Sequence, residues 1–142
     1  DSNRVLPSYR QDRLQIAREM VRVLKPDGFV MVSSPNRWFP LDMFHGRNPR
    51  QPLPRFNWPG NPFLLSAGDY RRLFGEAGCN RFRLLPVLGY WGFIRKKRTW
   101  KGRLLVAPVQ AVFRLVSWEG LRVLRALPVN PWLVMLMQKR LA

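Results

Sequence analysis

The chain has 142 residues, of which 46% are apolar. A chain of this length and composition buries a substantial core, which excludes a wholly disordered protein. Its 25 Lys and Arg residues stand against eight Asp and Glu, and the formal net charge of +17 favours anionic partners such as nucleic acid, acidic lipid headgroups or phosphorylated substrates.

The cysteine and histidine content excludes two kinds of site. Cys79 is the only cysteine, so no intrachain disulfide can form and a reducing, cytoplasmic compartment fits. We expect Cys79 to be a buried structural thiol. One histidine and one cysteine are too few for a zinc site. No signal-peptide pattern opens the chain, and no apolar run reaches the ~18 residues of a membrane span.

The first predicted elements are a helix and a strand. Residues from Ser8 to Leu24 place apolar side chains at helical spacing, with Ser8 as the N-cap. The run Lys25-Pro26-Asp27-Gly28 ends the helix, since proline cannot continue it and glycine permits a positive φ. Phe29–Ser34 is short and nearly all apolar, which predicts a strand buried on both faces of a parallel sheet. Helix, tight turn and buried strand form one half of a βαβ unit.

Residues 35–65 are rich in proline and aromatic side chains, which predicts a long irregular segment. Such a loop in a compact domain is typical of a lid or substrate wall, and a surface loop anchored by aromatic packing fits equally well. Ser66–Asp69 resembles a capping box that begins a short helix, which runs to about Ala77 and stops at Gly78. Residues 81–88 then alternate partly, as a strand does.

The last third of the chain begins with a second irregular stretch, residues 89–102. Residues 103–127 are predicted to form one broadly apolar helix, with Pro108 tolerated near its start or kinking it. Its polar residues make a narrow stripe that includes Arg122 and Arg125. Residues 128–131 break the helix, and Trp132–Met137 is predicted to be a final buried strand.

Three stretches of the chain share features with one known family. The first is Arg18-Glu-Met-Val-Arg-Val-Leu-Lys-Pro-Asp-Gly28, followed by the predicted strand and Ser34-Pro-Asn36. The second is the capped helix that ends in Glu76-Ala-Gly78, and the third is the last strand with Gln138-Lys-Arg140. Together they resemble class I S-adenosylmethionine-dependent methyltransferases. In that family a helix ending in R-x-L-K-P-G-G leads into the fifth strand, a later helix ends in E-A-G-F, and the last strand is antiparallel. Asp27 replaces the first glycine and Cys79 the aromatic residue.

The resemblance implies a mixed α/β fold that is the C-terminal part of a doubly wound, Rossmann-like sheet. Residues 1–94 would carry the sheet and helix portion with a substrate-side loop at 35–65. Residues 95–127 would be a basic amphipathic helical insertion, and residues 128–142 the final strand. The implied function is methyl transfer to a small-molecule or lipid-linked acceptor.

The implied cofactor, S-adenosylmethionine, has no binding motif in this chain. The family holds it on a glycine-rich turn after the first strand and on an acidic residue of the second, as other doubly wound folds hold nucleotides. No G-x-G-x-G follows a predicted strand here. The cofactor-binding half is therefore expected before Asp1 or in a second subunit, and this chain alone is expected not to bind the cofactor productively.

Candidate substrate-binding residues follow the first predicted strand, at the carboxyl end of the sheet, where open α/β folds bind ligands. Asn36 and Arg37 are candidates for hydrogen bonds to substrate oxygens. His45, the only histidine, is a candidate general base for O-methylation, and a surface or structural role is the alternative. Aromatic residues are candidates for an apolar wall, with core packing as the alternative: Trp38, Trp58, Tyr90 and Trp91.

A basic cluster precedes the long predicted helix and consists of Arg95, Lys96, Lys97, Arg98, Lys101 and Arg103. Basic residues beside an amphipathic helix suit contact with an anionic membrane, and a solvated charge run before a core helix is the alternative. Two other functions remain open. One is a nucleic-acid-binding module, in which arginines clamp phosphates and aromatic rings stack on bases. The other is a peripheral membrane adaptor that uses residues 95–127 alone.

Overall fold

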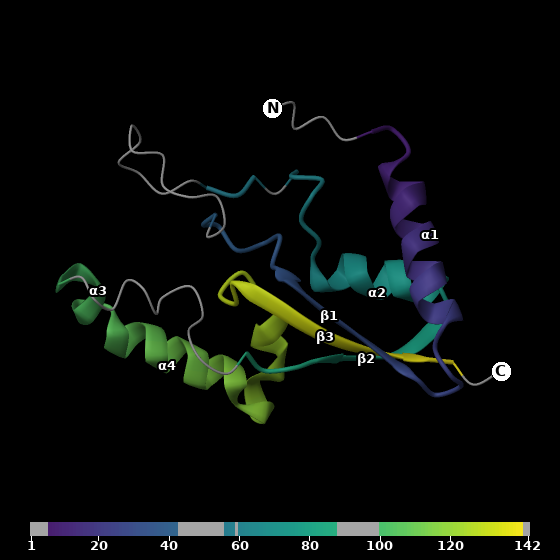
Figure 1. Ribbon diagram of the computed structural model, residues 1–142. Helices are drawn as coiled ribbons and strands as arrows, with labels where there is room; N and C mark the ends of the chain where they lie inside the picture. Colours follow the sequence, from purple (N-terminus) through teal and green to yellow (C-terminus); the bar gives the residue numbers. More distant parts are fainter. Residues whose placement is uncertain (1–5, 43–55, 59, 88–99, 141–142) are drawn as a thin grey trace.

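The computed structural model describes residues 6–42, 56–58, 60–87 and 100–140. These residues form a three-stranded sheet with helices near both of its ends (Figure 1). In chain order the elements are α1 (Tyr9–Arg22), β1 (Phe29–Pro35), α2 (Ala67–Glu76), β2 (Cys79–Leu84), α3 (Trp100–Leu104), α4 (Val106–Ser117), the 3₁₀ helix η3 (Glu119–Ala126) and β3 (Trp132–Lys139). The mixed α/β composition is confirmed.

Helix α1 and the turn into β1 lie where the sequence predicts them. Ser8 does not cap the helix as expected: its backbone is already helical, and its hydroxyl donates to the Asp12 carboxylate at 2.9 Å. In the turn it is Asp27, with φ 58°, that takes the left-handed conformation expected of glycine, which aspartate tolerates. Gly28 is needed for another reason. A Cβ there would lie 2.8 Å from the Lys25 carbonyl oxygen.

The sheet has the order β1-β3-β2, and both outer strands run antiparallel to β3. Val30 pairs with Met137 on one side of β3, and Phe82 pairs with Met137 on the other. The antiparallel last strand is confirmed. The parallel neighbour expected for residues 29–34 is not found within the described ranges, where β1 pairs along one edge only. The Rossmann-like arrangement therefore remains a proposal.

The core lies on one face of this sheet. Val30, Leu133, Met135 and Met137 point to that face and pack with the buried residues Ala17 and Val21 of α1 and Phe74 of α2. The side chains of β1 that alternate with Val30 point the other way, and Phe29 and Met31 are exposed. The prediction that β1 is buried on both faces is therefore wrong, because helices cover only one face of the described sheet.

Helix α2 begins and ends as predicted. Ser66 and Asp69 form a complete capping box, in which each side chain satisfies the other residue's backbone N–H. Gly78, with φ 106°, follows the C-cap residue Ala77 and ends the helix in the left-handed conformation that glycine adopts readily. Strand β2 begins at Cys79, two residues earlier than expected, and ends at Leu84.

The expected single helix over residues 103–127 is wrong. The helical segment starts at Trp100, and α4 ends at Ser117. Trp118 has an extended backbone (φ −68°, ψ 130°), after which η3 begins. The break is stable because Arg125 donates hydrogen bonds to the carbonyl oxygens of Val116 and Ser117, which a continuing helix would otherwise use. Across the described ranges, every helix is too short or too polar to cross a bilayer.

Candidate functional site

The turn after β1 carries three of the predicted substrate-binding residues, and the structure gives each a different position. Asn36 is fully buried, at 0% exposure. Its amide nitrogen donates to the carbonyl oxygens of Leu127 and Asn130, each at 2.9 Å, and its amide oxygen accepts from the Trp38 backbone N–H at 3.1 Å. The Asn36 side chain therefore joins the end of β1 to the loop before β3, and its polar atoms are directed at backbone groups.

Arg37 joins the same turn to α2. Its guanidinium donates to the Asp69 carboxylate at 3.0 Å, and both side chains are about a quarter exposed. Partial burial acts to raise the pKa of Asp69. Hydrogen bonds from the Ser66 N–H, the Ser66 hydroxyl and Arg37 outweigh it, so the pKa of Asp69 lies below its ordinary value. This carboxylate therefore stays ionised at neutral pH and fixes the position of Arg37.

We expect Asp69→Asn to destabilise the chain by about 1 kcal/mol at neutral pH, the usual cost of a lost helix cap. Because the folded-state pKa is below the unfolded-state one, the ionised carboxylate stabilises the fold above the unfolded pKa and stops doing so as the pH falls through the folded one. The difference in unfolding free energy between the unsubstituted chain and Asp69→Asn should thus be constant above about pH 5 and shrink below about pH 4. Urea unfolding across this range measures it, and a gap that widens toward acid would contradict it.

Of the other predicted site residues, the structure describes only some. Trp38 and Trp58 are exposed, so neither is packed in the core. Arg103 lies in α3 and is exposed, and Lys101 lies in the same helix. The remaining candidates fall outside the described residues: His45, Tyr90, Trp91, Arg95, Lys96, Lys97 and Arg98.

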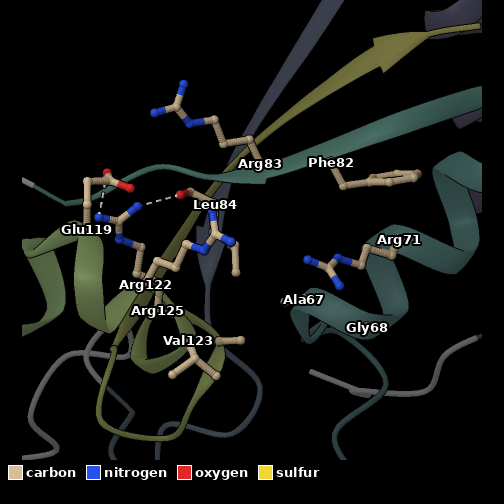
Figure 2. Close-up of a pocket in the computed structure, with 11 residues that line it drawn as sticks. Ala67, Gly68, Arg71, Phe82, Arg83, Leu84, Glu119, Arg122, Val123 and Arg125 are labelled. Carbon is tan, nitrogen blue, oxygen red and sulfur yellow. Dashed lines mark hydrogen bonds and ion pairs between the residues drawn. The ribbon is translucent and has the colours of Figure 1, made fainter.

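A pocket of about 680 Å³ lies beside the carboxyl end of β2 (Figure 2). It is lined by the first turns of α2, the last residues of β2 and one side of η3. Strands β1 and β2 run in the same direction, since each is antiparallel to β3. The pocket and the Asn36–Trp38 turn therefore lie toward the same, carboxyl edge of the sheet.

Four arginines line this pocket: Arg71, Arg83, Arg122 and Arg125. Arg71 and Arg122 extend toward each other from α2 and η3, whereas Arg83 points away from them (Figure 2). Apolar side chains provide the rest of the lining, including Phe82, Leu84 and Val123. A surface of this kind suits a ligand with an anionic group and an apolar part, because guanidinium groups bind phosphate and carboxylate oxygens through paired donors.

The buried side chain of Arg125 joins the elements around the pocket. It is 1% exposed and donates four hydrogen bonds, to the carbonyl oxygens of Val116, Ser117 and Leu84 and to the Glu119 carboxylate at 2.9 Å. The hydrogen bond from Arg125 lowers the pKa of Glu119, and the charges of Arg83 and Arg122 add to this effect. Among the described residues that line the pocket, Glu119 alone is acidic, so this lining has an excess of positive charge.

Sequence reasoning missed these arginines as site residues. Arg71 lies on the helix predicted from the capping box and given no site role, and Arg122 and Arg125 were assigned to a narrow polar stripe. The available signal was Glu119 itself, the only acidic residue after Glu76. A single carboxylate within so basic a segment marks the place where an arginine has a partner.

Two kinds of chemistry find no support among the described side chains. They contain no group of three or more His, Cys, Asp or Glu residues placed to hold a metal ion. Cys79 is buried, as expected; burial raises the pKa of its thiol, and the nearby charge of Lys139 only partly opposes that. The thiol therefore remains protonated at neutral pH, and thiolate chemistry at Cys79 is disfavoured.

Comparisons with family models, with curated proteins and with solved structures found no match to this chain.

Proposed function

We propose that this chain is the substrate-side, C-terminal part of a class I S-adenosylmethionine-dependent methyltransferase that acts on a small-molecule or lipid-linked acceptor. The observation that carries the proposal is the incomplete sheet. Strand β1 follows α1 through a tight turn, exposes Phe29 and Met31 on one face, and pairs with β3 along one edge only within the described ranges. A strand of this kind suits a central position in a larger sheet.

All pairings in the described sheet are antiparallel, and the parallel bridge between Asn36 and Leu65, just after β1, is isolated. The proposal therefore requires a parallel neighbour for β1 from outside the described residues. A longer protein without such a strand would reject the proposal. The sheet resembles the end of a doubly wound fold only if such a strand exists. An isolated antiparallel sheet would be a different, small α/β fold.

The residues that the structure describes do not form a cofactor site. Strand β1 ends at Pro35 and is followed by Asn36-Arg37, and strand β2 is followed by Leu85-Pro86-Val87. These described residues include none of the glycines that let backbone approach a nucleotide-like ligand. The contribution we assign to this chain is acceptor binding. Arg71 and Arg122 would hold an anionic group of the acceptor, and Phe82, Leu84 and Val123 would contact its apolar part.

The test compares the 142-residue chain with a longer protein that includes the sequence which the proposal places before Asp1. By titration calorimetry we expect the longer protein to bind S-adenosylmethionine and the 142-residue chain to give no measurable heat. The upstream sequence should contain a strand followed by G-x-G-x-G. Micromolar binding by the 142-residue chain, or an upstream sequence without such a strand, would reject the proposal.

A substitution on the exposed face of β1 tests whether this face becomes buried in the longer protein. Met31→Glu should change the stability of the 142-residue chain by no more than about 0.5 kcal/mol, because Met31 is already exposed. In the longer protein it should cost about 2 kcal/mol or more if β1 lies inside a larger sheet, where a carboxylate would be buried. Equal effects in the two proteins would show that this face stays exposed.

A further inference from the structure

The outward side of α3, α4 and Trp118 is an apolar surface that the proposed function does not explain. We name it the α3–α4 face and define it by Trp100, Leu104, Leu105, Pro108, Ala111, Val112, Leu115 and Trp118, all of them exposed. Trp100 is 68% exposed, Leu104 71% and Trp118 64%. We propose that this face binds the surface of an anionic lipid bilayer, and the proposal stands whether or not the chain is part of a methyltransferase.

Helix α4 has the wrong polarity for a helix that faces water. Its inward positions contact the rest of the protein through Val116, which is buried, while its outward positions at Pro108, Ala111, Val112 and Leu115 are apolar. An ordinary surface helix has charged or polar residues there. Helix α1 provides the comparison, because most of its exposed positions are charged or polar, among them Arg10, Asp12 and Arg18, and only Ile16 and Met20 are apolar exceptions.

The charges around this face select the partner. The sequence contains no acidic residue from Ala77 to Trp118, while Arg103 and Arg114 are exposed beside the apolar side chains. A surface that is both apolar and cationic suits acidic headgroups above an apolar layer. It does not suit pairing with a second copy of the chain, since two such faces would bring arginines of like charge together.

The size and position of the face fit shallow insertion. Helix α4 has 12 residues, so it is too short to span a bilayer and suits a position in the plane of the interface. Trp100 and Trp118 lie at the two ends of the α3–α4 segment, and tryptophan favours the headgroup level. In Figure 1, α3 and α4 lie at the opposite end of the molecule from α1.

The test is co-sedimentation of the 142-residue chain with vesicles. One set contains phosphatidylcholine and phosphatidylglycerol, and the other contains phosphatidylcholine alone. We expect at least about tenfold tighter binding to the mixed vesicles, and a loss of that preference in high salt, where charge interactions are screened.

Two variants and a matched control assign the binding to this face. Leu104→Glu and Leu115→Glu should each weaken binding to the mixed vesicles by about tenfold or more, because each places a carboxylate against lipid. Ile16→Glu makes the same change at an exposed position of α1 and should leave binding within about twofold. Circular dichroism of all three variants confirms that they remain folded.

Several results would overturn the proposal. They are the absence of binding to the mixed vesicles, equal binding to both vesicle types, and equal losses for Ile16→Glu and Leu104→Glu. A fourth is binding to single-stranded RNA that is tighter than binding to the mixed vesicles, if Leu104→Glu abolishes that RNA binding. That result would identify the face as a nucleic-acid surface instead.

Discussion

Replacing Arg125 with alanine is expected to lower the free energy of unfolding by about 3–5 kcal/mol, because several buried or partly buried carbonyl oxygens lose their donors and each such group left without a partner costs about 1–3 kcal/mol. The Arg125 side chain joins α4, η3 and β2 through its four hydrogen bonds. Its loss leaves the carbonyl oxygens of Val116, Ser117 and Leu84 without their donors. Urea unfolding followed by circular dichroism measures the change.

Arg122→Ala provides the control for this prediction. It removes the same side chain from the same 3₁₀ helix, but Arg122 is exposed, so its loss should change stability by no more than about 0.5 kcal/mol. Equal effects of the two substitutions would show that burial of Arg125 does not matter to the fold. Arg125→Lys should recover little of the loss, because one ammonium group cannot reach all four acceptors in the geometry of a guanidinium fork.

Asn36→Ala is expected to cost about 2–4 kcal/mol, because each of several buried polar groups left without a partner costs about 1–3 kcal/mol, offset in part by relaxation. The groups affected are the carbonyl oxygens of Leu127 and Asn130 and the backbone N–H of Trp38. Thermal and urea unfolding measure the loss. A contact to substrate alone would leave stability unchanged and alter only ligand binding, so the result decides between the predicted site role and the structural one.

Asn80→Ala is the matched control for Asn36. Asn80 is an exposed asparagine on strand β2, and we expect its substitution to change the unfolding free energy by about 0.5 kcal/mol or less. If Asn36→Ala proves equally mild, the buried amide is not what joins β1 to the loop before β3.

The local elements could be predicted because each depends on neighbours in the chain. The capping box of Ser66 and Asp69 is complete within four residues, and Gly78 ends the same helix. The apolar run at residues 29–34 formed a strand, and the run before Lys139 formed the last strand. Spacing, caps and turn residues act over a few positions, so one sequence is enough to read them.

Pairing, burial and the site were decided only by the tertiary structure. The sequence of β1 does not say that it pairs antiparallel with β3 or that Phe29 and Met31 remain exposed, because burial depends on what covers each face. Helical spacing placed Arg125 on a polar stripe, yet it is buried, because the break at Trp118 turns η3 back against β2 and three carbonyl oxygens meet its guanidinium. Asn36 looked like a ligand for substrate and is instead held by a loop 91 and 94 residues later in the chain. Contacts between residues so far apart follow from packing of the whole core, which local pattern does not encode.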